Sequence, residues 1–179
     1  QAETDHAVTL KCAAGQAQVI RVGSAGQTIT IGKLVIDAES NAAASCIGVN
    51  GTTARALALS GTLLRNPGTG RFGVESINSS QVLTLTVENV DFECSTTAGA
   101  VYCLLGADAY VSINGLTVDN SAGPGVSNTL RAPVYINATA SAVAHIRRVS
   151  GTWKTQSAAV SASFIRMSGA RGVIEYNRG

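Results

Sequence analysis

Four charged residues recur along the chain at a spacing that could assemble a site for glycoside chemistry. Asp37, Arg65, Glu93 and Asp119 follow apolar stretches at intervals of 28, 28 and 26 residues, and Lys154 is a less regular fifth member. If these positions lie side by side, two carboxyl groups about 5 to 10 Å apart could protonate a leaving oxygen and attack the sugar or activate water. We therefore consider Glu93, Asp119 and Asp37 as candidate catalytic residues. The alternative is a polar edge that only faces water.

A basic cluster is the second group with chemical potential. Arg147 and Arg148 adjoin His145 and lie close in sequence to Trp153 and Lys154. An arginine pair suits the carboxylate of an acidic sugar, because the guanidinium binds carboxylates in a bidentate manner. The alternative is that the two arginines fill a turn and that His145 is an outward residue of a strand.

The few large aromatic residues form a third group. Tyr102 and Tyr135 occupy matching places in two short apolar stretches, and Trp153 is the single tryptophan. Outward rings in a row make a platform on which sugar rings stack. The candidate carbohydrate-binding residues are thus Tyr102, Tyr135, Trp153, Arg147 and Arg148, although the two tyrosines could equally be ordinary cross-strand neighbours.

The composition limits the remaining functional classes. The chain has 179 residues, a formal net charge of +2, 45% hydrophobic, 4% aromatic and 13% charged residues, and 19 glycines. We expect neither nucleic-acid binding nor membrane insertion, because there is no basic excess and no long apolar run. No glycine-rich phosphate loop or metal-ligand spacing is visible, so we expect no cofactor and no metal site.

The elements that must position these residues are set by a repeat. The phrases QTITIGKLVID (27–37), RALALSGTLLR (55–65), LTLTVENVDFE (83–93) and AYVSINGLTVD (109–119) alternate like strands, break for two residues and alternate again. A shorter strand lies upstream of each phrase, as in VIRV (19–22) and CIGV (46–49). The last apolar residues before the breaks form a series at 28, 28, 26, 33 and 28 residues: Ile31, Leu59, Val87, Ile113, Ile146 and Ile174. A period in this range predicts stacked units, here about six coils of about 28 residues with three short strands each.

The two-residue breaks are consistent with sharp bends between strands. Such a bend needs one residue with positive φ, which Gly and Asn adopt most easily. Gly61, Asn89 and Gly115 fit this requirement at the second position, whereas Lys33 and Arg148 do not and count against the pattern.

This rhythm of strands and turns, over roughly residues 15 to 176, resembles the right-handed parallel β-helix of pectate-lyase-like proteins and phage tailspikes. The resemblance implies an all-β, single-stranded solenoid that contacts long carbohydrates on its outer face. We expect residues 1–14 to be an N-terminal capping segment and 15–179 to be a parallel β-helix domain, part of a longer chain. The open ends of such a solenoid, and the resemblance to trimeric tailspikes, also suggest a homotrimer.

The resemblance leads to three functional hypotheses. The first is a segment of a phage tail spike or fibre, located in the virion tail, that binds host surface polysaccharide and could depolymerise it. The second is a secreted bacterial lyase or hydrolase of the pectate-lyase type, and the third is a structural passenger segment of a surface adhesin. Whether the chain is an enzyme is left open; a glycoside hydrolase or polysaccharide lyase would be the class.

The chain contains four cysteines: Cys12, Cys46, Cys94 and Cys103. The favoured interpretation is that they are buried thiols acting as small hydrophobic residues. If a disulfide exists, the pairing across one loop, Cys94 with Cys103, is the most plausible.

Overall fold

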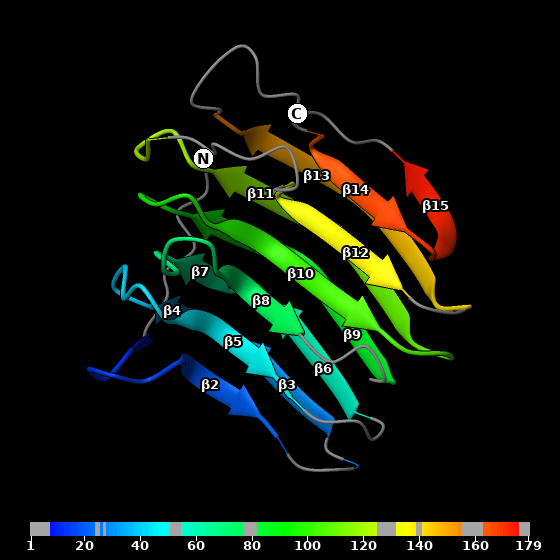
Figure 1. Ribbon diagram of the computed structural model, residues 1–179, viewed down its shortest axis with the longest axis horizontal. Helices are drawn as coiled ribbons and strands as arrows, with labels where there is room; N and C mark the ends of the chain where they lie inside the picture. The colour runs from blue at the N-terminus through cyan, green and yellow to red at the C-terminus, as the bar shows by residue number, and fades with distance from the viewer. Residues whose placement is uncertain are drawn as a thin grey trace.

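The computed structural model describes residues 8–23, 26, 28–50, 55–76, 82–124, 132–138, 141–154 and 163–175. Within these residues the protein is all-β, with fifteen strands in two parallel sheets and no helix (Figure 1). The sequence-based fold class, a parallel β-helix, is confirmed.

The first sheet contains the short strands that were expected upstream of each repeated phrase. Neighbouring strands come from successive coils and pair in parallel throughout. Its six strands are β2 (Gln18–Val22), β5 (Ser45–Val49), β8 (Phe72–Ser76), β10 (Gly99–Leu105), β12 (Val134–Ala138) and β14 (Ile165–Ser168).

The second sheet has nine strands and bends to form the other two sides of each coil. In the later coils one long strand covers both sides, whereas in the earlier coils the bend separates two strands. The strands are β1 (Val8–Lys11), β3 (Thr28–Gly32), β4 (Leu34–Asp37), β6 (Arg55–Ser60), β7 (Leu63–Arg65), β9 (Leu83–Glu93), β11 (Tyr110–Asp119), β13 (Val143–Thr152) and β15 (Arg171–Glu175).

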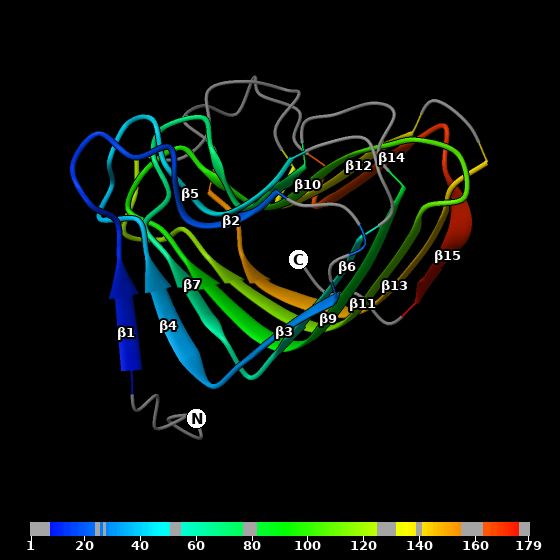
Figure 2. The same ribbon diagram turned by 90° about the horizontal axis from the view of Figure 1, so that it is seen from below.

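The chain winds through these sheets as a right-handed solenoid. Seen from the end that carries β2 and β3, it runs clockwise as it recedes from the viewer (Figure 2). The solenoid has about five turns rather than the six expected.

The register of the coils matches the repeat read from the sequence. Ile31 pairs with Leu59, Leu59 with Val87, and Val87 with Ile113. The series then continues through Ile146 to Ile174. Residues about 28 apart in the chain are therefore neighbours in space, as the periodicity predicted.

Inward-facing residues of these columns fill a single apolar core. Leu57, Leu85, Val111 and Phe92 are almost completely buried, as the alternation of the phrases predicted. Because each coil has only one inner face, its side chains are covered by the coils above and below.

All five second positions of the breaks adopt positive φ. The φ angles are 53° at Lys33, 56° at Gly61, 49° at Asn89, 85° at Gly115 and 52° at Arg148. The expectation that Lys33 and Arg148 would not fit was therefore wrong. The neighbouring coil holds the bend in place: the Lys33 N–H, for example, donates to the Ser60 carbonyl at 3.1 Å. This tertiary constraint outweighs the cost of about 1 to 2 kcal/mol for a left-handed non-glycine residue.

The four cysteines are buried and free, so no disulfide joins Cys94 to Cys103. Complete burial raises the pKa of Cys46 to about 12, and burial does the same for Cys103. These thiols act as small core residues, as the favoured interpretation held.

Candidate functional site

The charged residues that follow the third side of each coil do form one column. Register pairs join Asp37 to Arg65, Arg65 to Glu93, and Glu93 to Asp119. The next position is Thr152 rather than Lys154. This corrects the sequence interpretation: each column member lies four residues after its bend, and Arg148 plus four is Thr152.

Lys154 lies beyond the column and is held by another coil. Its backbone N–H donates to Asn120 Oδ1 at 2.6 Å, and its carbonyl accepts from Asn120 Nδ2 at 3.2 Å. Its ammonium group donates to the Gly123 carbonyl at 3.0 Å. Lys154 therefore stabilises a corner between two coils.

Asp37 is fully engaged in structural contacts. Arg65 Nη2 and Nε both approach Asp37 Oδ2, at 2.9 and 3.0 Å. The other oxygen, Oδ1, accepts from the backbone N–H of Glu39 at 2.8 Å and from Asn66 Nδ2 at 3.4 Å. Since the Asp37 side chain is only 8% exposed, its carboxylate supports the corner and is not presented to a ligand.

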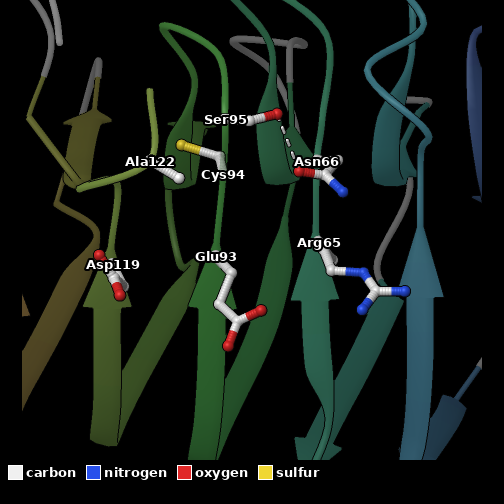
Figure 3. A pocket seen from close by; sticks show the side chains of 7 residues that line it. All are labelled: Arg65, Asn66, Glu93, Cys94, Ser95, Asp119 and Ala122. Carbon is white, nitrogen blue, oxygen red and sulfur yellow. Dashed lines mark hydrogen bonds between the residues drawn. The ribbon is translucent and has the colours of Figure 1, made fainter. Parts of the chain in front are cut away.

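Glu93 and Asp119 line one open groove of about 300 Å³ at the ends of β7, β9 and β11 (Figure 3). Arg65 also reaches this groove, but its guanidinium turns toward β4 and away from Glu93 (Figure 3). Among the described residues, the Glu93 side chain has no hydrogen bond or ion pair. The complete lining is Arg65, Asn66, Glu93, Cys94, Ser95, Asp119 and Ala122.

The two carboxylates of the groove differ in their electrostatics. Hydrogen bonds from the Ser121 side chain and from its backbone N–H, which donates to Asp119 Oδ1 at 2.8 Å, lower the pKa of Asp119. Asp119 is therefore ionised at neutral pH and could act as a base or nucleophile. The structure thus brings together two of the three predicted catalytic residues, Glu93 and Asp119, and leaves Asp37 outside.

The groove lining also includes polar side chains that the sequence interpretation missed. Ser95 Oγ donates to Asn66 Oδ1 at 3.2 Å, and the hydroxyl groups of Ser40 and Ser95 lie 3.3 Å apart. Asn66 directly follows Arg65, and Ser95 lies two residues after Glu93. The spacing of the column would therefore have identified both.

The basic cluster does not converge on a site. Arg147 pairs with Glu175 at 3.2 Å, and Arg148 Nε donates to Asn114 Oδ1 at 2.8 Å. The ring of His145 packs edge-on against Tyr110, with centroids 5.7 Å apart. Trp153 is partly buried and packs against the core.

Tyr102 and Tyr135, in contrast, lie side by side on the outer face of the six-stranded sheet. They form a register pair between β10 and β12, with ring centroids 5.4 Å apart and an angle of 58°. Phe72 of β8 stacks on Tyr102 at 5.0 Å and 26°. On the other side, the Arg166 guanidinium carbon lies 5.0 Å from the Tyr135 ring centroid. We call these four side chains the aromatic row.

A buried carboxylate adjoins the aromatic row. Glu75 is the register partner of Tyr102 and is 6% exposed. It accepts a hydrogen bond from Ser45 Oγ, and Arg71 Nε lies 3.3 Å from its Oε2 as an ion pair without hydrogen-bond geometry. The charge of Glu75, beside Tyr102 of the row, is thus compensated by Arg71.

No family model, curated protein or solved structure matches this chain. In the described residues, no group of three or more His, Cys, Asp or Glu side chains could hold a metal ion. No helix in the same part of the chain is long and apolar enough to cross a membrane.

Proposed function

We propose that this protein binds polysaccharide on the outer face of its six-stranded sheet, as a segment of a phage tail spike or fibre. The observation that carries the proposal is the in-register pair Tyr102 and Tyr135, extended to a row by Phe72. Sugar rings have apolar faces that stack on aromatic rings, and the hydroxyl groups of tyrosines add hydrogen bonds at the edge.

Rigidity favours this use of the row. Each ring is fixed by its neighbour on the next coil, and Arg166 holds Tyr135 from the other side. Binding to a preformed surface loses little side-chain entropy, so a modest contact area still gives useful affinity. Repetition along a polymer then multiplies weak contacts into avidity.

The test compares Tyr135→Ala with Tyr110→Ala. Both tyrosines are partly exposed, but Tyr110 lies on the other sheet and packs against His145. We expect Tyr135→Ala to weaken binding about tenfold, roughly the value of one ring contact, and Tyr110→Ala to leave it unchanged. Affinity electrophoresis against a panel of bacterial surface polysaccharides measures this. Equal binding by the two variants, or no binding by the unmodified protein to any polysaccharide, contradicts the proposal.

Cleavage of a glycosidic bond in the groove is a second candidate function. Glu93 and Asp119 occupy neighbouring strands and one groove. In this scheme Glu93 protonates the leaving oxygen, and ionised Asp119 activates water or attacks the anomeric carbon. The bond to the leaving sugar breaks as the new bond to water or carboxylate forms.

Release of reducing ends from the polysaccharide that binds tests the second function. Glu93→Gln and Asp119→Asn should each lower the rate at least about 100-fold. The control is Glu88→Gln, since Glu88 is an exposed carboxylate on the same strand, outside the groove. A rate unchanged in Glu93→Gln would contradict a catalytic groove without affecting the binding proposal.

A further inference from the structure

The cation at one end of the aromatic row has no acidic partner among the described residues. Arg166 of β14 is the register partner of Tyr135, and its guanidinium carbon lies 5.0 Å from the centroid of that ring. The Arg166 side chain is partly exposed. None of the ion pairs between described residues includes it. Its positive charge therefore lies beside an exposed ring without a described carboxylate to compensate it.

The contact with Tyr135 leaves the hydrogen-bond donors of Arg166 available. A guanidinium that lies over an aromatic ring presents its flat face to the ring. Its five N–H donors lie in its own plane and point away from that ring. Two of them can form parallel hydrogen bonds to the two oxygens of one carboxylate. Arg166 can thus pack on Tyr135 and bind a carboxylate at the same time.

The face that carries the row has little negative charge. Glu75 is the single acidic residue in the six strands of this sheet. It is 6% exposed and its charge is compensated by Arg71. Arg21 and Arg166 occupy the same outward column as Glu75. The described strands of this face therefore present more positive than negative charge, in contrast to the groove with its two carboxylates.

Two neutral polar side chains adjoin the arginine. Asn137 and Ser168 form a register pair between β12 and β14, two residues beyond Tyr135 and Arg166 along each strand. Residues two apart on a strand point to the same face, and Asn137 is partly exposed while Ser168 is exposed. Amide and hydroxyl groups can donate hydrogen bonds to a carboxylate or to sugar hydroxyl groups. This end of the row thus combines a ring, a cation and two neutral hydrogen-bonding groups.

We propose that Arg166 makes the aromatic row selective for polysaccharides whose sugars carry a carboxylate, such as uronic acids. The inference rests on the proposed saccharide binding to this face and names the class of saccharide. A sugar on the exposed part of Tyr135 lies next to Arg166, because neighbouring strands are about 4.8 Å apart. The carboxylate of a uronic acid is attached directly to the sugar ring, so it can reach the guanidinium while the ring stays in contact with Tyr135. A neutral sugar in the same place offers no such acceptor, and the difference gives selectivity.

The experiment combines one change in the protein with one change in the ligand. The probes are bacterial surface polysaccharides that contain uronic acids, alginate and hyaluronan among them, before and after their carboxyl groups are reduced to alcohols. Biolayer interferometry at about 0.15 M salt measures their binding to the unmodified chain and to Arg166→Gln. We expect either change to weaken binding about 10- to 100-fold. Both changes together should weaken it no further, because each removes the same contact.

Two more variants test the role of the guanidinium. Arg166→Lys keeps the charge but loses the bidentate donors, so it should recover only part of the affinity for the acidic polymers. Arg21→Gln is the matched control, since Arg21 is exposed in the same column but lies four strands from Tyr135. This distance exceeds the Debye length at about 0.15 M salt, so the affinity should change less than about twofold. Thermal unfolding followed by circular dichroism verifies that each variant is folded.

The outcomes separate selectivity from saccharide binding itself. An equal loss of affinity for acidic and reduced polymers in Arg166→Gln would show that Arg166 only supports Tyr135, which overturns the proposed selectivity. A preference of the unmodified chain for the reduced polymers would overturn it as well. If Tyr135→Ala abolishes a binding that Arg166→Gln leaves unchanged, saccharide binding stands and selectivity falls. Binding to no polysaccharide, acidic or neutral, overturns both.

Discussion

The charged column and the aromatic row both consist of outward residues from successive coils. They differ in the contacts that neighbouring side chains make with one another. In the column, Arg65 and Asp37 satisfy each other, and the carboxylates of Glu93 and Asp119 remain at an open groove. In the row, each ring contacts the next, and Tyr102 and Tyr135 are partly exposed, whereas Phe72 is only 8% exposed. The same backbone repeat therefore gives charged side chains at one edge, of which Asp37 and Arg65 are paired, and aromatic rings in mutual contact on one face.

Each region also contains one buried carboxylate with an arginine partner. Asp37 is 5% exposed and Glu75 is 6% exposed. Asp37 makes two charge-assisted contacts with Arg65 and accepts a hydrogen bond from the backbone N–H of Glu39. Glu75 accepts a hydrogen bond from the Ser45 hydroxyl group and forms an ion pair with Arg71 that lacks hydrogen-bond geometry. The buried carboxylate of Asp37 thus supports a corner of the solenoid, and that of Glu75 lies beside Tyr102 of the row.

Substitution of Asp37 should have the largest effect on stability. Asp37→Ala leaves Arg65 and the Glu39 N–H without their acceptor, so we expect a loss of about 2 to 3 kcal/mol in the free energy of unfolding. Glu93→Gln, in the same column, should change this value by less than about 0.5 kcal/mol. Urea unfolding measures both. Comparable losses in the two variants would show that the column does not divide into structural and exposed members.

A glycine substitution tests whether the row depends on close packing. A Cβ at Gly99 would lie 2.3 Å from Phe72 Cε1 and 2.5 Å from Cδ1, so Gly99→Ala must displace the ring. We expect a destabilisation of about 1 to 2 kcal/mol and weaker polysaccharide binding.

The matched control is Gly48→Ala on the same face. Its Cβ would meet the flexible side chain of Gln18, which can move away. Thermal unfolding and affinity electrophoresis of the two variants separate the effects. Unchanged binding in Gly99→Ala would contradict a contribution of Phe72 to the proposed saccharide-binding surface.

The smallest effect concerns the pH response of the groove. Because the pKa of Asp119 is lowered in the folded state, its contribution to stability is present above the unfolded value of about 3.9 and is lost as the pH falls through the folded value. Ser121→Ala removes the hydroxyl donor, so an NMR titration should give a higher Asp119 pKa.

The stability difference between Ser121→Ala and the unmodified protein should accordingly be visible near pH 7 and vanish near about pH 2. Asp108→Asn provides the control, since Asp108 is an exposed aspartate outside the groove. An Asp119 pKa that stays unchanged in Ser121→Ala would mean that the backbone N–H alone holds the carboxylate.

The sequence predicted those features that depend on periodicity. The inward columns through Ile31 and Leu59, and the charged column through Glu93, follow from alternation with a constant interval. It did not predict the positive φ of Lys33 and Arg148, because the neighbouring coils impose this conformation against the local preference of the residues.

The sequence predicted only part of the aromatic row, and the physical reason is different. Tyr102 and Tyr135 repeat at matching positions, but the alternation breaks near Phe72. The N–H groups of Ala100 and Val101 both donate to the Pro133 carbonyl, and a Cβ at Gly73 would contact the core residues Leu64 and Phe92. A local bulge therefore turns Phe72 outward, and no simple count along the strand detects it.

Because the coils pair in parallel, equivalent backbone positions on the outer face recur at a fixed distance along the axis. Successive strands lie about 4.8 Å apart, so the backbone positions of Tyr102 and Tyr135 are one such distance apart along the axis. A polymer whose repeat length is a multiple of this distance would stay in phase with the backbone of the coils, whereas one with another repeat length would not. Under the proposed function, the repeat length of the polysaccharide would then affect binding in addition to its chemical groups.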